Sequence, residues 1–209
     1  MSAIDELFER CPRLAVCREQ IEAACDALVG CFAGGGKLLA CGNGGSAADA
    51  DHIVGELMKG FLGRRALPHD QRARIEAADP EVGPGIAMRL QGALPAINLS
   101  AASALTTAFG NDVSAELAFA QQVLGYGKRG DVLLGLSTSG NAANVRAALC
   151  VARALGMRTI GMTGSTGGRM AGLCDILIAV PATRTFEVQE MHLPVYHCLC
   201  AMIEAHFFS

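Results

Sequence analysis

Two residues suited to acid–base chemistry, His52 and Glu56, lie four positions apart in a stretch with helical character. Side chains at positions i and i+4 project from one face of a helix, so an imidazole and a carboxylate there can act on the same reacting group. The same spacing also describes a surface pair that contributes roughly 0.2–0.5 kcal/mol to a helix. The loop that precedes the helix decides between these interpretations.

This loop, Gly-Asn-Gly-Gly-Ser at 42–46, has a counterpart, Ser-Thr-Ser-Gly-Asn, at 137–141. Each follows a short apolar run, 37–41 or 131–136, that is typical of a buried parallel strand, and each precedes a helical stretch. Glycines let backbone amides turn inward, hydroxyls add donors, and the helix N-terminus favours an anion. Ordinary strand-to-helix turns share this composition. Two matching loops at the carboxyl ends of strands nevertheless favour a phosphate site.

Polar residues also interrupt the apolar C-terminal stretch, where Gln189, His192 and His197 stand among hydrophobic neighbours. Buried polar groups require partners. We therefore interpret His192 as a hydrogen-bonded core histidine, whereas for His197 packing and catalysis are equally compatible with the residues alone.

The bulk composition limits the class of protein. The chain has 209 residues, of which 51% are hydrophobic and 18% charged, with a net charge of -3. This predicts one domain with apolar surface left for subunit contacts, no broad attraction to nucleic acid or anionic membranes, and no membrane span. The basic stretch 64–74 alternates with acids and is interpreted as a solvated face. Nine cysteines without a C-x-x-C pair, and an N-terminus without a secretory signal, predict free thiols in the cytoplasm.

The hydrophobic periodicity predicts an α/β fold, a three-layer sandwich in which helices cover both faces of a five-stranded parallel sheet. A long N-terminal helix over 3–32 has a possible break at Pro12, and Ser46 is expected to cap the helix over 46–61. The segment from about 62 to 95 is rich in proline and is predicted to be an insertion with short helices at 70–78 and 83–91. The remaining strands are expected at 96–99, 158–162 and 175–180, and the remaining helices at 101–109, 116–124, 141–155 and 188–207.

The order of the motifs resembles that of the sugar isomerase (SIS) domain family and, within it, the phosphoheptose isomerases. The motifs are Cys-Gly-Asn-Gly-Gly-Ser-Ala-Ala-Asp-Ala at 41–50, His52 with Glu56, Gly-Asn-Asp at 110–112, Gly-Asp-Val-Leu-Leu-Gly-Leu-Ser-Thr-Ser-Gly-Asn at 130–141, and Val-Gln-Glu-Met-His at 188–192 followed by His197. The resemblance covers nearly the whole chain apart from the insertion. It implies a single SIS domain over 1–209 with a Rossmann-like sheet.

This resemblance implies an isomerase that interconverts sedoheptulose 7-phosphate and D-glycero-D-manno-heptose 7-phosphate through a cis-enediol, in heptose or lipopolysaccharide biosynthesis. It implies that Glu56 is the general base and His197 its acid–base partner. The substrate-binding residues would be Asn43, Gly44, Gly45, Ser46, Glu56, Asn111, Asp112, Ser137, Thr138, Ser139 and Gln189. One zinc ion per subunit would be bound by His52, Glu56, Gln189 and His197, in a homotetramer with sites at subunit interfaces.

The spacing of Gln189 and His197 limits that zinc site. Eight residues of helix separate them by about 12 Å along the axis and about 80° around it, too far for easy convergence on one ion. Either a bend near Pro194 or a partner chain is therefore expected to complete the set.

Three positions depart from the family pattern. Ala142 stands where the family often has a phosphate-binding serine, and Glu187 and Gly60 each stand where it has an arginine. Lys59 is a candidate to replace part of the lost positive charge. These departures predict a different phosphate pocket and, with it, a different substrate. Two other functions stay open, although the retention of Glu56 and His197 argues against the first. One is a noncatalytic SIS protein that binds a sugar phosphate or associates with a replication initiator. The other is an isomerase for another sugar phosphate.

Overall fold

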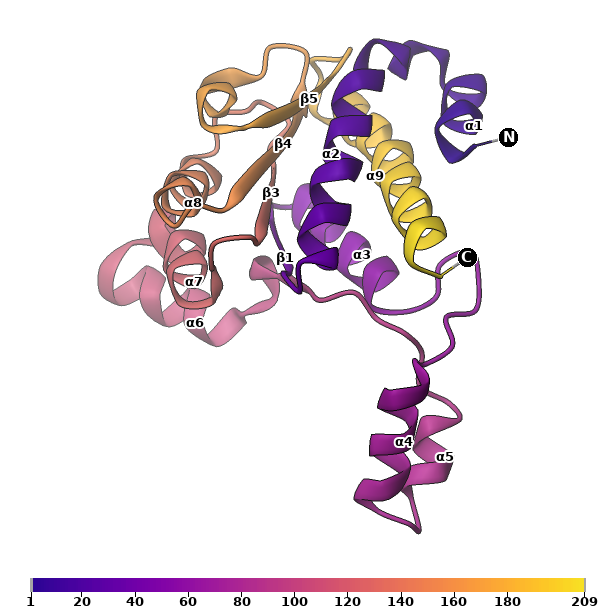
Figure 1. The fold of residues 1–209 in the computed structure, drawn as a ribbon. Coiled ribbons are helices and arrows are strands. Elements are labelled where there is room, and N and C mark those ends of the chain that lie inside the picture. Colours follow the sequence, from indigo (N-terminus) through magenta and orange to yellow (C-terminus); the bar gives the residue numbers. More distant parts are fainter. Residues whose placement is uncertain (1, 209) are drawn as a thin grey trace.

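The computed structural model describes residues 2–208, which form the expected α/β sandwich around a five-stranded, all-parallel sheet (Figure 1). The strand order is β2-β1-β3-β4-β5. The strands are β1 (Leu38–Cys41), β2 (Ala96–Asn98), β3 (Val132–Leu136), β4 (Arg158–Gly164) and β5 (Ile176–Val180). Each lies at the position predicted from its apolar run.

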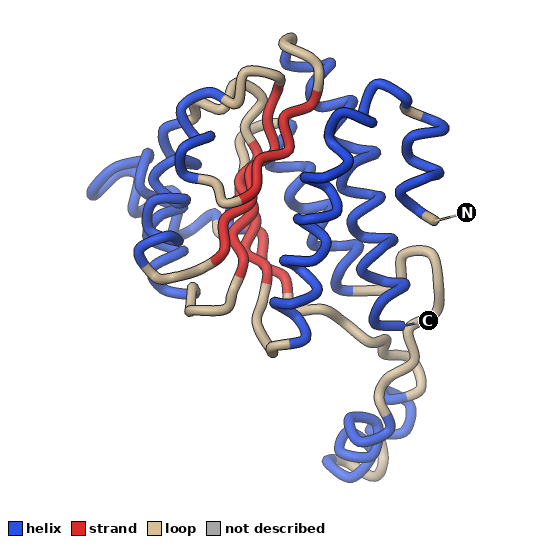
Figure 2. The backbone as a smooth tube through the Cα atoms, turned by 45° about the horizontal axis from the view of Figure 1, so that its top comes forward, coloured by secondary structure: helices blue, strands red, loops and turns tan. Residues whose placement is uncertain are grey.

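Helices cover both faces of the sheet, as Figure 2 shows. One face carries α1 (Ala3–Arg10), α2 (Arg18–Ala33), α3 (Gly45–Met58) and α9 (Thr185–Phe208), and the other carries α6 (Ser103–Phe109), α7 (Ala118–Tyr126) and α8 (Ala143–Ala154). The predicted N-terminal helix is divided by a 3-10 segment, Pro12–Cys17, because proline favours a new helical start and cannot continue the preceding one. The expected Ser46 cap is wrong: the α3 N-cap is Gly44, and Ser46 lies inside the first turn.

The strands are apolar throughout because both of their faces are buried. In β1, Leu38 and Ala40 belong to the core beneath α2, α3 and α9, whereas Leu39 and Cys41 belong to the core beneath α7 and α8. The chain changes direction across the sheet between β1 and β3, since β2 lies on one side of β1 and β3 on the other. In such a sheet, ligands bind beyond the carboxyl ends of the strands at this point. The two glycine- and serine-containing loops begin there.

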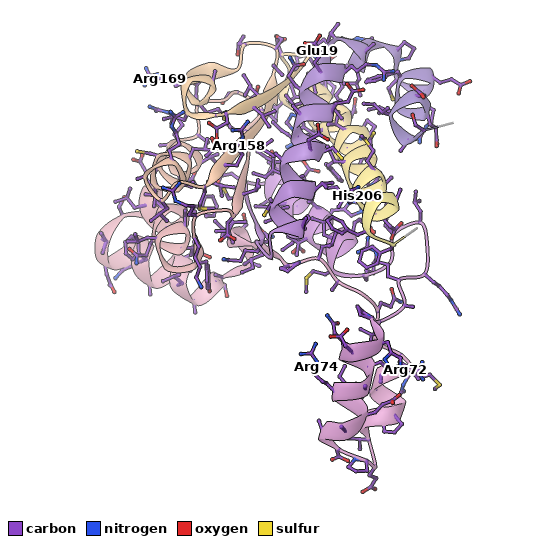
Figure 3. The ribbon with its side chains drawn as sticks, viewed as in Figure 1. Glu19, Arg72, Arg74, Arg158, Arg169 and His206 are labelled. Atoms are coloured by element: carbon purple, nitrogen blue, oxygen red, sulfur yellow. The ribbon has the colours of Figure 1, made fainter. Side chains whose placement is uncertain are left out.

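The segment between α3 and β2 extends from the body as an arm, residues 62–95, with two helices (Figures 1 and 3). These are α4 (His69–Ala78) and α5 (Gly83–Ala87), so the second is shorter than predicted. No residue of α4 is buried. Arg72 and Arg74 on this helix lie far from the sheet and pair with Glu76 and Asp70 on the same helix.

The base of the arm is held by a buried ion pair between Arg65 and Glu204 of α9, with Nε and Oε1 2.7 Å apart. Arg65 also donates to the main-chain carbonyls of Glu56 and Leu57 at the end of α3. Its side chain is 0% exposed. The prediction that the whole stretch 64–74 is solvated is therefore wrong at Arg65. Its partner, Glu204, lies 139 residues away in the sequence, so the local pattern of charges does not reveal the pair.

Within residues 2–208, no helix combines the length and the apolar composition that a membrane span requires.

Candidate functional site

A pocket of about 360 Å³ lies at the carboxyl ends of β1 and β3. Its lining includes eight of the predicted substrate-binding residues: Asn43, Gly44, Gly45, Ser46, Ser137, Thr138, Ser139 and Gln189. The helices α3, α8 and α9 all begin at or beside this lining. The positive ends of their dipoles lie at this lining, so the pocket suits an anion although none of its lining residues among 2–208 is a lysine or arginine.

The shape of the two loops depends on glycine at one position in each. Gly44 has φ 55° and Gly140 has φ 67°, a left-handed region that disfavours other residues. A Cβ at Gly140 would also lie 2.0 Å from the carbonyl oxygen of Gly167. The side-chain amides of Asn43 and Asn144 bond reciprocally, at 2.9 and 2.8 Å, and so join the first loop to α8. The sequence offered no signal for this pair.

The N-terminal turn of α9 closes the pocket. A Cβ at Gly45 would come within 2.4 Å of Gln189 Nε2, so the amide end of the Gln189 side chain rests against position 45 and would have to move if a side chain stood there. Thr185, the first residue of α9, also lines the pocket. Sequence reasoning missed it because the predicted helix began at 188. A threonine followed by an acidic residue, Glu187, is the start signal that was available.

The expected catalytic side chains meet farther along the same two helices. His52 Nε2 lies 3.2 Å from Glu56 Oε1 and 3.5 Å from His197 Nε2. The Glu56 side chain is only 12% exposed, so it does not point into bulk solvent. Lys59 Nζ donates to Glu56 Oε2 at 2.9 Å and is not among the residues that line the anion pocket. The structure thus brings His52, Glu56 and His197 together and places Lys59 beside the carboxylate.

Burial, together with the nearby His52, lowers the pKa of His197 below its usual value, which favours a neutral imidazole. His192 is fully buried and its Nε2 contacts the carbonyl of Thr163, which confirms the interpretation of a core histidine. Burial lowers the pKa of His192 to about 4. Its Nδ1 has no hydrogen-bond partner within the described chain.

Two predicted substrate-binding residues lie elsewhere. Asn111 and Asp112 occupy the helical turn Gly110–Ser114, where their side chains bond to each other, and they are absent from the pocket lining. Of the three departures from the family pattern, Ala142 lines the pocket, whereas Glu187 pairs with the guanidinium of Arg184. The pocket therefore lacks the hydroxyl that a serine at position 142 would add.

The donor atoms around His52 agree only in part with a zinc site. A tetrahedral zinc with ligands at about 2.0–2.1 Å places neighbouring ligand atoms about 3.3–3.4 Å apart. The spacings of 3.2 and 3.5 Å around His52 match this value. Gln189, however, lines the anion pocket, and within residues 2–208 no three His, Cys, Asp or Glu side chains form a complete metal-binding group. One chain alone therefore does not bring the four predicted ligands together. The helix α9 continues through Pro194 without a break.

The fold and the site define an α/β protein with a polar pocket at the carboxyl ends of its strands and, farther along α3 and α9, a carboxylate and two imidazoles in contact. The sequence profile of the SIS domain matches residues 4–82 and 71–164. The phosphoheptose isomerase of Rhodospirillum rubrum is 40% identical over 192 residues, which are 92% of this chain and 88% of the relative. That of Burkholderia pseudomallei (strain 1710b) is 40% identical over 189 residues, 90% of this chain and 83% of the relative.

Two solved structures show the same similarity in three dimensions. The phosphoheptose isomerase of Neisseria gonorrhoeae is 34% identical with a TM-score of 0.73, covering 97% of this chain and 91% of its own. That of Francisella tularensis is 30% identical with a TM-score of 0.74, covering 98% and 100%. The chain belongs to the SIS-domain family and, within it, to the phosphoheptose isomerases.

Proposed function

We propose that this protein is an aldose–ketose isomerase that interconverts sedoheptulose 7-phosphate and D-glycero-D-manno-heptose 7-phosphate. The observation that carries the proposal is the convergence of Glu56 and His197 on His52, on the two helices whose N-termini form the anion pocket. A phosphoryl group in the pocket would direct the rest of the sugar along α3 and α9 towards the carboxylate.

The length of the substrate agrees with this placement. Gln189 at the pocket and His197 at the cluster are eight residues apart, about 12 Å along α9. With carbon–carbon bonds of about 1.5 Å, an extended heptulose 7-phosphate spans roughly 10 Å from its phosphorus to C1, and a five-carbon analogue is about 2.5 Å shorter. The separation therefore favours a seven-carbon sugar bound in its open-chain form.

The chemistry is a balanced transfer of protons. The Glu56 carboxylate takes a proton from C1 of the ketose while a proton reaches O2, which gives the cis-enediol. His197, a neutral imidazole, gives the proton to O2 and takes one from O1. Return of the first proton from Glu56 to C2 completes the aldose. The amides and hydroxyls of the pocket hold the phosphate throughout and fix the reacting carbons beside the carboxylate.

Zinc binding is a separate proposal. His52, Glu56 and His197 offer the mixture of nitrogen and oxygen donors that zinc accepts, and the separation of Gln189 from them favours a set completed by another chain. A bound zinc ion would polarise the carbonyl group of the sugar. Elemental analysis of the purified protein measures the metal content directly.

We also propose a cytoplasmic homotetramer with its sites at subunit interfaces. All nine cysteines are free, as in a reducing compartment. Several large apolar side chains are more than half exposed and favour subunit contacts: Val16, Leu62, Val82, Met88, Leu90, Val113, Leu124 and Phe186. Light scattering coupled to size exclusion measures the mass that tests this assembly.

The function is tested by incubating the protein with sedoheptulose 7-phosphate and following the aldose phosphate. Loss of a general acid or base costs about 10²–10⁴ in rate, so Glu56→Gln and His197→Ala are expected to lower kcat by that factor while the sugar phosphate still binds. His69→Ala, which removes an exposed histidine on the arm, serves as the matched control with unchanged kcat. Binding of the substrate without turnover by the wild-type protein favours the noncatalytic alternative. Turnover of a different sugar phosphate alone favours the other isomerase.

A further inference from the structure

A second pocket, of different character, lies at the base of the arm. Residues 64–66 form one wall and residues 88–91 the other, and the cavity between them has a volume of about 430 Å³. Small-molecule sites in proteins are usually cavities of about 300–1,000 Å³. Within residues 2–208, this pocket shares no lining residue with the anion pocket at the ends of β1 and β3, and none of its lining residues is acidic. The function proposed above gives it no role.

The two walls of this pocket are fixed to each other and to the body. The main-chain amide of Gly92 donates to the carbonyl of Arg65 at 2.9 Å, and the amide of Gly60 donates to Gln91 Oε1 at 2.7 Å. The Arg65 side chain is 0% exposed and its guanidinium already contacts Glu204 and two carbonyls at the end of α3. Arg65 therefore shapes the pocket but leaves the binding of a ligand to other side chains.

Two other guanidinium groups at this pocket are available to a ligand. Three of the five arginines in the arm are paired with carboxylates. The remaining two, Arg64 and Arg89, form no ion pair with any residue among 2–208, and both line this pocket and are exposed. Arg89 donates from Nε to the carbonyl of Gly85 at 2.9 Å, which leaves its two NH₂ groups. The pocket thus carries two positive charges without a counter-ion.

The rest of the lining is apolar. Ala66, Met88 and Leu90 stand beside the two arginines, and Met88 is 73% and Leu90 51% exposed. A ligand with an anionic group and an apolar body would cover this wall and neutralise both guanidinium groups. A phosphomonoester carries a charge of about −1.5 to −2 at pH 7 and has three acceptor oxygens, which matches two arginines. A carboxylate carries one charge and is satisfied by a single guanidinium fork.

We propose that the pocket at the base of the arm is a second anion site, which binds an organic phosphomonoester. Its phosphoryl group would lie on Arg64 and Arg89, and its organic body against Met88 and Leu90. The site is separate from the proposed reaction, since none of these residues belongs to the predicted catalytic or substrate-binding set. The proposal does not rest on the isomerase function.

The test uses phenyl phosphate, which has a phosphomonoester, an apolar body and no carbonyl group to isomerise. Calorimetry on the full chain counts the molecules bound per chain. The variant Arg64→Gln/Arg89→Gln is compared with Arg72→Gln/Arg74→Gln, which removes the same two charges from α4, where these side chains pair within their own helix (Figure 3).

We expect the wild type and the Arg72→Gln/Arg74→Gln control to bind the same number of phenyl phosphate molecules, and Arg64→Gln/Arg89→Gln to bind one fewer per chain. A hydrogen bond to a charged group contributes about 1.5–3 kcal/mol, so each single substitution should weaken this site about 10- to 100-fold. Arg64 and Arg89 are exposed, so their variants should keep the wild-type thermal unfolding. The single variants guard against a folding defect in the double one.

Two further probes define the class of ligand. Inorganic phosphate lacks the organic body and benzoate lacks the second charge, so each should bind this site at least about tenfold more weakly than phenyl phosphate. Equal binding of inorganic phosphate overturns the role of Met88 and Leu90. Equal binding of benzoate overturns the preference for a phosphomonoester.

The site itself is overturned if Arg64→Gln/Arg89→Gln binds as many phenyl phosphate molecules as the wild type, or if the Arg72→Gln/Arg74→Gln control loses as much binding. Light scattering on the same samples covers another occupant. A changed assembly mass without a lost phenyl phosphate molecule assigns Arg64 and Arg89 to a subunit contact and also overturns the site. Because binding is measured without turnover, a failure of the proposed isomerase function is distinguishable from a failure of this site.

Discussion

The Glu204→Gln variant provides a sharp test of how the arm is fixed to the site. Glu204 accepts hydrogen bonds from the main-chain amides of Phe61, Leu62 and Gly63 at 2.7, 2.7 and 3.1 Å, and from Arg65 Nε at 2.7 Å. A glutamine at position 204 has only one acceptor oxygen and no charge, so the buried guanidinium of Arg65 loses its counter-ion. The NH₂ group of the glutamine would also face one of the N–H donors that the carboxylate now accepts from.

The expected loss is large because both partners are buried. Removing one member of a buried ion pair costs about 3–5 kcal/mol. For a chain of this size, each kcal/mol lowers Tm by about 2–4 °C, so Glu204→Gln should unfold about 6–20 °C below the wild type. The control is Glu22→Gln, whose carboxylate is 46% exposed and pairs with Arg18 at the surface; it should change the stability by less than about 0.5 kcal/mol.

Thermal unfolding at equal protein concentration and pH 7 measures the difference. Burial opposes ionisation of Glu204, but the bonds from Phe61 and Arg65 outweigh it and hold the pKa of Glu204 below its usual value. A carboxyl group with a lowered folded-state pKa contributes stability above its unfolded pKa and loses it as the pH falls through the folded value. The difference in Tm between the wild type and Glu204→Gln should therefore become smaller as the pH falls. A Glu204→Gln protein as stable as Glu22→Gln at pH 7 would refute the assigned role of the ion pair.

Two further predictions concern His192 and Gly45. Burial lowers the pKa of His192 to about 4, so the unfolded chain binds more protons between pH 6.5 and 4, and stability falls as the pH drops through that window by at most about 3.4 kcal/mol. His192→Gln should flatten this dependence of Tm on pH, whereas His69→Gln should not. Gly45→Ala places a methyl group 2.4 Å from Gln189 Nε2 and should weaken sugar-phosphate binding about tenfold (about 1.4 kcal/mol) in calorimetry. Gly55→Ala in the same helix meets no atom within 4 Å and should raise stability by about 0.5–1 kcal/mol with unchanged affinity. Equal affinities in the two variants would contradict a role in binding for the Gln189 side chain as it lies against position 45.

The sheet and the anion pocket were predictable because their signals are local. A buried parallel strand is apolar on both faces, so β1 and β3 stand out as short hydrophobic runs, and the loops that follow carry the glycines and hydroxyls that an anion requires. The pairing of His52 with Glu56 follows from helical spacing alone. Each of these features depends on residues within a few positions of one another.

The missed features depend on contacts between distant segments. Arg65 looks like one more surface arginine until α9 brings Glu204 beside it, and Tyr196 looks like core packing until its hydroxyl meets Asp49 and His52. The register between α3 and α9 decides the contacts of Tyr196, and the path of the chain beyond α3 decides that of Arg65. Hydrophobic periodicity specifies only which face of each helix is buried. A single sequence does not contain that register.

The register between α3 and α9 also explains how one pair of helices serves three purposes. Gln189 lies against Gly45 and His197 contacts His52, at sequence separations of 144 and 145 residues, so the two helices run in the same direction and keep one register over these turns. Glu204 contacts Phe61 in the segment that follows α3. The N-termini of the two helices line the pocket that we propose for the phosphate, their middle turns hold His52, Glu56 and His197, and their C-terminal turns anchor the arm. The arm therefore lies at the end nearest the base and farthest from the phosphate. Disturbance of its anchor should reach kcat through the carbonyl of Glu56, to which Arg65 donates, before it reaches the affinity for phosphate.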